Sequence, residues 1–142
     1  MNYIKEAESE LRCYDELNKS VARIENELQL INRELTNVKS MNYDAVPGGN
    51  NPYPDDRIVN LIFKKQEKED ALSLTHDKLR HIDDILESLG EDGVILRRTY
   101  INGEMYFKIY NDLNMSERTF YNRKAEAVRR FSIQLFGIKA VI

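Results

Sequence analysis

The chain contains no tryptophan and one cysteine, and it has only three prolines and six glycines among 142 residues. The single cysteine, Cys13, cannot form an intramolecular disulfide, so the fold cannot rest on a disulfide framework. No apolar run approaches the roughly 20 residues that a membrane-spanning helix needs. The first residues, Met-Asn-Tyr-Ile-Lys-Glu, lack the apolar stretch of a secretory signal. These absences predict a cytoplasmic protein that makes no contact with a membrane.

Residues typical of metal sites and of catalysis are also scarce. His76, His81 and Cys13 are the only soft metal ligands, and Cys13 lies far from both histidines in the sequence. The chain has no phosphate-binding glycine loop and no Ser, His and acidic set typical of a hydrolase. A tyrosine nucleophile acting on DNA is conceivable with eight tyrosines, but such a site needs several basic groups around one phosphate, and the chain is short for it. We therefore expect a protein that is not an enzyme and that needs neither a metal nor another cofactor.

The residues that are abundant favour helix. Glu, Lys, Leu, Asn and Arg dominate the sequence, and charged residues make up 32% of it. Long unbranched side chains lose little rotamer freedom in a helix, and the few prolines and glycines leave long stretches that a helix can occupy. The composition therefore predicts an all-α fold.

The small net charge of −3 conceals a strong asymmetry along the chain. Residues 1–96 contain twelve Lys and Arg against twenty Asp and Glu, a net charge of −8. Residues 97–142 contain nine against four, a net charge of +5. Because basic groups release counterions from phosphates, the C-terminal third is the part that a polyanion would approach.

Apolar residues follow a heptad pattern over the first forty residues. From Leu17 onward the steps alternate between four and three, and a three-residue slip connects this run to an earlier one. The earlier run is Ile4, Ala7, Leu11 and Tyr14, and the later one is Leu17, Val21, Ile24, Leu28, Ile31, Leu35 and Val38. The pattern favours a homo-oligomer, most simply a dimer, that associates through Leu17, Val21, Ile24, Leu28, Ile31 and Leu35. A hairpin that packs only within its own chain is the alternative.

All three prolines and a glycine pair fall between residues 41 and 56, which predicts a loop there. A second, weaker helical pattern follows the loop, interrupted by Lys65, Glu69 and His76. Two long helices joined by a loop predict an antiparallel coiled-coil hairpin over residues 1–90. The apolar positions of the second helix are Ile58, Ile62, Leu72, Leu79, Ile82, Leu86 and Leu89.

Short helices are expected after the hairpin, in a second domain over residues 91–142. Gly90 and Gly93 mark the exit from the long helix, and Asn102-Gly103 closes a short helix. Another short helix is predicted over residues 104–113, and Asn114-Met115-Ser116 forms a tight turn. Ser116 is expected to cap a last helix over residues 117–136, with Glu117 in its first turn. A short helix, a turn and a longer capped helix are typical of a helix-turn-helix unit, which makes the C-terminal domain a helix-turn-helix bundle.

The last helix divides into two faces when it is projected at 100° per residue. Arg118 is positioned to read guanine, Asn122 to read adenine, and Tyr121 to contact a phosphate or a thymine methyl. Such a basic face can also be ordinary solvated surface, but the capped turn, the aromatic core and the local positive charge together favour double-stranded DNA. The expected core face is Phe120, Lys124, Ala127, Phe131, Leu135 and Ile138, and the phosphate contacts are Lys108, Arg123, Arg129 and Arg130.

The run from Ile109 to Tyr121, with the stretch Ser116-Glu117-Arg118-Thr119-Phe120-Tyr121, resembles the C-terminal region of phage late transcriptional regulators of the ArpU type. That region is itself similar to the DNA-binding fourth region of bacterial sigma factors. The resemblance implies a regulator of a phage or prophage late operon in a bacterial host. We expect it to act in the cytoplasm, where its acidic coiled region would contact bacterial RNA polymerase or a second subunit. The resemblance adds Ser116 and Thr119 to the expected DNA-binding residues. The chain departs from the usual pattern at Tyr110, where most such units have a small residue.

Two other functions are compatible with this sequence. A phage packaging component of the small terminase kind also joins a helix-turn-helix to helical oligomerisation segments. A protein-binding inhibitor of a host factor could use the helix-turn-helix as a scaffold. The sequence favours the transcription regulator over both.

Overall fold

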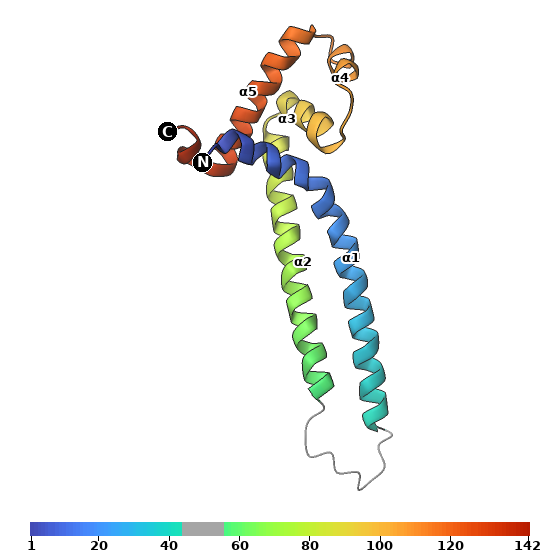
Figure 1. The fold of residues 1–142 in the computed structure, drawn as a ribbon. Helices are drawn as coiled ribbons and strands as arrows, with labels where there is room; N and C mark the ends of the chain where they lie inside the picture. The colour runs from blue at the N-terminus through green and yellow to red at the C-terminus, as the bar shows by residue number, and fades with distance from the viewer. Residues whose placement is uncertain (44–55) are drawn as a thin grey trace. The chain divides into compact units, whose positions relative to one another are not determined.

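The computed structural model describes residues 1–43 and 56–142, and every regular element in them is a helix (Figure 1). This confirms the all-α fold. Of the predicted loop at 41–56, residues 44–55 lie outside the described residues, while the first helix continues to Tyr43 and the second begins at Asp56. The elements are α1 (Tyr3–Tyr43), α2 (Asp56–Ser88), α3 (Glu91–Leu96), the π-helical turn η1 (Arg97–Ile101), α4 (Tyr106–Asp112), α5 (Glu117–Phe136) and the 3₁₀ turn η2 (Gly137–Ala140).

Contacts between residues divide the chain into two compact units. Unit 1 consists of Met1–Leu17 and Lys78–Ile142, and unit 2 consists of Asn18–Asp77. Each long helix therefore contributes one part to each unit. This grouping differs from the two domains that the sequence predicts, 1–90 and 91–142, and that division stays a prediction.

In unit 2 the parts of α1 and α2 run side by side and antiparallel (Figure 1). Ile31 and Leu35 of α1 are buried in one cluster with Leu61 of α2, and the Lys68 ammonium lies 2.6 Å from the Glu27 carboxylate. Residues later in α2 thus contact residues earlier in α1: Lys68 pairs with Glu27, whereas Leu61 packs with Ile31 and Leu35. This order confirms the antiparallel hairpin. The later heptad run is therefore at least partly covered by its own chain.

One apolar position of α2 was predicted wrongly. Ile62 is 52% exposed, whereas Leu61 beside it is 7% exposed and belongs to the core of unit 2. Neighbouring residues on a helix are rotated by about 100°, so only one of the two can face α1. Leu61 is the residue that faces α1 and packs against it.

The core of unit 1 joins the beginning of the chain to its C-terminal helices. The rings of Tyr3 and Phe136 lie 5.2 Å apart, and the hydroxyl of Ser132 donates to the carbonyl of Tyr3 at 3.4 Å. Thus the first turns of α1 pack with α5. The buried residues of this core are Ala7, Leu11, Ile82, Ile85, Leu86, Leu89, Leu96, Ala127, Val128 and Phe131.

Two glycines allow α2 to turn into α3. Gly90 has φ of +62°, a conformation that glycine adopts without a side-chain penalty. A Cβ at Gly93 would lie 1.9 Å from the carbonyl oxygen of Leu86, so no larger residue fits while α3 stays in place. The predicted helix exit at these two glycines is confirmed, and it sets the position of α3 against α5.

Candidate nucleic-acid interface

A short turn connects α4 to α5. Asn114 adopts φ of +55°, a left-handed conformation that asparagine tolerates, and the amide of Met115 donates to the carbonyl of Tyr110 at 3.0 Å. The Ser116 hydroxyl then accepts a hydrogen bond from the amide of Thr119 at 3.2 Å. The cap predicted at Ser116 and the predicted bounds of the last helix are both confirmed.

Aromatic packing holds α4 against the start of α5. Phe120 is fully buried with Ile109 and Ile95, and its ring lies 5.8 Å from that of Tyr110 and 5.4 Å from that of Tyr106. The ring of Tyr110 thus packs on that of Phe120.

The predicted core face of α5 is correct over its first five positions. Phe120, Ala127 and Phe131 are fully buried, and Lys124 and Leu135 are half-buried. Ile138 was predicted wrongly, because it is 68% exposed. The helix ends before it, where Gly137 adopts φ of +72°, so the helical projection no longer applies.

Lys124 lies among three tyrosine rings. Its ammonium donates to the hydroxyl of Tyr106 at 3.1 Å, and it lies 4.6 Å from the centroid of that ring. The centroids of the Tyr100 and Tyr121 rings are 5.7 and 5.8 Å away. Cation–π attraction to these rings explains how a lysine occupies the core side of α5.

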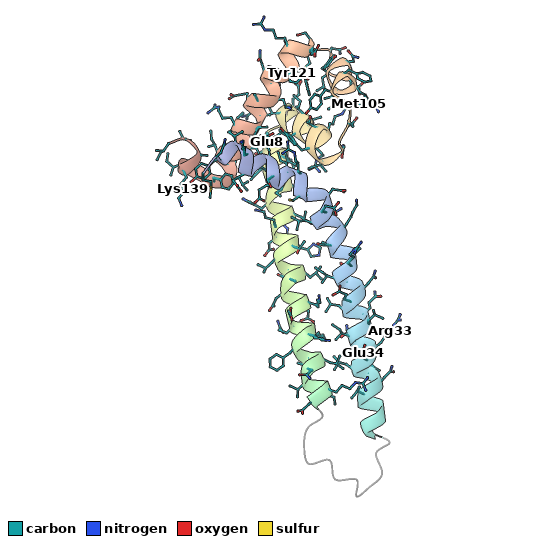
Figure 2. All side chains as sticks on the ribbon, viewed as in Figure 1. Glu8, Arg33, Glu34, Met105, Tyr121 and Lys139 are labelled. Carbon is teal, nitrogen blue, oxygen red and sulfur yellow. The ribbon has the colours of Figure 1, made fainter. Side chains whose placement is uncertain are left out.

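The first two turns of α5 present the predicted base-reading residues to solvent. Arg118, Thr119, Tyr121 and Asn122 are all exposed. Neither Arg118 nor Asn122 makes a side-chain hydrogen bond or an ion pair with any other residue in the described ranges. Their donors and acceptors are available for a ligand. Figure 2 shows Tyr121 on this part of α5.

The arginines that follow on α5 are turned toward carboxylates. Arg123 donates to Asp92 Oδ1 at 3.2 Å, and Arg130 donates to Asp92 Oδ2 at 2.5 Å. Arg129 pairs with Glu126 one turn before it, at 2.8 Å. Three of the four expected phosphate contacts are therefore engaged within the chain.

Asp92 is the residue that the sequence did not single out. It is only 7% exposed and joins α3 to α5 through two guanidinium groups. Asp92 follows Glu91 in the first turn of a short helix, where acidic residues are common, so the sequence gives no sign of a special role. The burial and the two partners arise from the packing of helices that are distant in sequence.

A second carboxylate cluster holds the segment before α4. Arg98 donates to both carboxylate oxygens of Glu104, at 2.9 and 2.8 Å, and to Asp112 at 2.6 Å. These bonds lower the pKa of Glu104, and the nearby charge of Lys108 lowers it further. Lys108, the fourth expected phosphate contact, is exposed on α4.

Exposed apolar residues at the start of α4 were also missed. Met105 is 66% exposed and Phe107 is 51% exposed, next to Tyr106 at 36%. Figure 2 shows Met105 at the entry to α4. Their exposure depends on which side of α4 packs on α5, and a helix of seven residues is too short to reveal that side by its periodicity.

The part of the chain that the structure describes holds no group of three or more His, Cys, Asp or Glu side chains placed to bind a metal ion. No helix there is long and apolar enough to cross a membrane.

The chain matches a known protein family. The model of a family described as "Protein of unknown function (DUF1492)" matches residues 34–132, which is more than half of the chain. No curated protein and no solved structure matches it.

Proposed function

The chain belongs to this family of unknown function, DUF1492, and from that premise we propose that it is a sequence-specific DNA-binding transcription regulator. Arg118 and Asn122 carry the proposal, because both are exposed and unpaired on the first two turns of a capped helix. Guanidinium and carboxamide groups form paired hydrogen bonds with guanine and adenine in the major groove. On this proposal α5 enters the groove and α4 lies across the backbone.

The ion pairs divide the basic residues between two roles. Arg129 and Glu126 are both about half exposed, and a surface pair of this kind contributes only about 0–1 kcal/mol, so a phosphate can replace the carboxylate. Lys108 is exposed and serves a phosphate directly. Arg123 is bound to the buried Asp92, so we assign it to holding α3 against α5.

Regulation would proceed by recruitment. The C-terminal helices select the DNA site, and the acidic remainder of the chain, with a net charge of −8 over residues 1–96, contacts bacterial RNA polymerase or a second copy. The resemblance to ArpU-type regulators supports a late operon of a phage or prophage as the target. The cytoplasm of the bacterial host is the compartment in which this would occur.

Selection from a pool of DNA duplexes with a randomised centre tests this function. The wild-type chain should enrich one sequence, and its affinity should fall steeply with salt. In Arg118→Ala/Asn122→Ala, each lost base contact should cost about 1–3 kcal/mol on the enriched sequence and little on random DNA. Lys139→Ala, which also removes an exposed cation but lies beyond α5, should keep the sequence preference.

Two results would count against the proposal. The first is that the chain enriches no sequence over random duplex at physiological salt, and the second is that the double variant retains the full preference. Circular dichroism of each variant would establish that the helices remain formed.

A protein-binding module is the second candidate, and the exposed side chains of Met105 and Phe107 favour it. Methionine and aromatic residues are enriched at the centre of protein interfaces. An inhibitor of a host factor would use this surface and treat α5 as a scaffold. Its activity would then be lost in Met105→Ser/Phe107→Ser and kept in Arg118→Ala/Asn122→Ala, the reverse of what a DNA-reading regulator shows.

A further inference from the structure

Tyr106 of α4 lies beside the exposed face of α5 that carries Arg118. Its ring is 5.8 Å from that of Tyr121, and its hydroxyl accepts a hydrogen bond from the Lys124 ammonium at 3.1 Å. At 100° per residue, Tyr121 lies about 60° from Arg118 around α5, and Lys124 lies about another 60° beyond Tyr121. Tyr106 therefore packs on one flank of α5, between its exposed face and its core face.

The flanks of a helix in the major groove lie next to the DNA backbone. An α-helix with its side chains is about 10–12 Å in diameter, and the major groove is about 12 Å wide. Such a helix fills the groove, so the side chains on its two flanks lie beside the phosphates at the two edges. When α5 occupies the groove, Tyr106 and Tyr121 come to the edge on the α4 side.

The hydroxyl of Tyr106 is free to donate to an anion. Its oxygen accepts from Lys124, so its single O–H points elsewhere, and within residues 1–43 and 56–142 it has no other hydrogen-bond partner. Tyr106 is 36% exposed, so a ligand can reach it. The hydroxyl of Tyr100, whose ring also lies near this lysine, already donates to Glu8 at 2.8 Å.

Lys124 makes the Tyr106 hydroxyl a stronger donor. A hydroxyl that accepts from a cation is polarised, so its O–H forms a stronger hydrogen bond with the next acceptor. The ammonium also lies 4.6 Å from the centroid of the Tyr106 ring, and this attraction holds the ring in place. Lys124 is thus a positioning residue that acts through Tyr106.

We propose that Tyr106 is a phosphate anchor for duplex DNA, whose hydroxyl donates to one backbone phosphate while Lys124 orients and polarises it. This inference rests on the proposed DNA-binding function, and it adds an uncharged contact to the basic ones. A phosphate contact carries no sequence information, and a neutral donor releases no counterion. Tyr106 should therefore contribute equally to every DNA sequence and leave the salt dependence of binding unchanged.

Tyr106→Phe tests the anchor, because it removes the hydroxyl and keeps the ring. Fluorescence anisotropy with the enriched duplex and with a random-sequence duplex measures its affinity. Both should bind at least about tenfold more weakly than to the wild type, because a hydrogen bond to a charged group is lost. The slope of log affinity against log salt concentration should stay that of the wild type. Replacing single phosphates by uncharged methylphosphonates should reveal one position that matters more to the wild type than to Tyr106→Phe.

Tyr110→Phe is the matched control. Tyr110 lies one turn later on α4 and its ring also packs on Phe120, at 5.8 Å, but its hydroxyl is not bonded to Lys124. This variant should bind DNA as the wild type does. The positioning role is tested in a Lys124→Met background, where Tyr106→Phe should cost less than about threefold, because residues that act together have non-additive effects.

The proposal is overturned if Tyr106→Phe binds like the wild type, if its loss is confined to the enriched sequence, or if Tyr110→Phe loses as much. A full loss from Tyr106→Phe in the Lys124→Met background would remove the role of the lysine. Failure of the proposed function gives a different result: the wild type enriches no sequence, while Tyr106→Phe still weakens binding to random duplex. A wild type that binds no duplex overturns both. Helical circular dichroism of each variant excludes unfolding as the cause.

Discussion

Asp92 connects two helices through a single side chain. Its carboxylate is almost wholly buried and binds both Arg123 and Arg130 of α5. Asp92→Asn removes the charge while keeping the shape, and it leaves two guanidinium groups without their partner. We expect the free energy of unfolding to fall by about 1.5–3 kcal/mol, the range for hydrogen bonds that involve charged groups. Urea unfolding followed by circular dichroism measures this loss.

Glu91→Gln is the control for the Asp92 variant. Glu91 also pairs with Arg123, but at 3.8 Å and with 52% of its side chain exposed. Exposed pairs of this kind contribute little, so the loss should stay below about 1 kcal/mol. Equal losses in the two variants would mean that the burial of Asp92 has no special importance for the packing of α3 on α5.

At the scale of elements, the close approach of α3 to the end of α2 depends on Gly93. A methyl group there would lie 1.9 Å from a backbone oxygen of Leu86, which cannot rotate away as a side chain could. Gly93→Ala should therefore push α3 outward and lower the free energy of unfolding by at least about 2 kcal/mol, within the range for overpacked interiors. A thermal melt measures the effect as a lower Tm.

Gly103→Ala separates crowding from backbone strain. Gly103 has φ of +64° but open space around its Cβ position, so alanine meets strain alone there, worth about 1–2 kcal/mol. Gly93→Ala should be the more damaging of the two. If it is the milder substitution, α3 does not need its close contact with α2.

At the scale of the whole molecule, the free energy of unfolding should depend on pH. Ionisation of carboxylates should limit stability at acid pH, and ionisation of tyrosines should limit it at alkaline pH. Hydrogen bonds from Arg98 lower the pKa of Glu104, and a hydrogen bond from Arg129 lowers the pKa of Glu126. A carboxylate with a lowered pKa in the folded state stabilises the fold above its ordinary value of 4.5. That contribution is lost as the pH falls through the folded-state pKa.

The alkaline limit arises from two tyrosines. Burial, followed by hydrogen bonds to Glu8 and to Asp83, raises the pKa of Tyr100 and of Tyr14 above the ordinary value of 10.0. A raised pKa contributes stability that is complete below pH 10 and is lost as the pH rises through the folded-state values.

Chemical denaturation at a series of pH values measures both limits. We expect constant contributions from these groups between about pH 5 and pH 9.5, and decline outside that range. Glu104→Gln/Glu126→Gln should flatten the acid limb, and Tyr100→Phe should flatten the alkaline limb. If the loss of stability at acid or alkaline pH is the same in these variants as in the wild type, other groups cause the pH dependence.

Local chemistry was enough to predict most of the helices. The serine cap at Ser116, the asparagine and glycine positions in the turns, and the end of α5 at Phe136 all follow from interactions within a few residues. The exposure of Arg118 and Asn122 follows in the same way, because the periodicity of one helix defines its outer face. The sequence by itself therefore determined the fold class, the order of the helices and the solvent-facing residues of α5.

Contacts between distant segments decided the rest. The joining of the first turns of α1 to the C-terminal helices, the burial of Asp92 between two arginines, and the choice of Leu61 over Ile62 each depend on which helices meet. Periodicity assigns a face to a helix but does not name its partner, since burial of apolar area is non-directional. Only the tertiary structure decided that Arg123 and Arg130 bind a carboxylate of their own chain, because the energy of a charge depends on the groups that packing places around it.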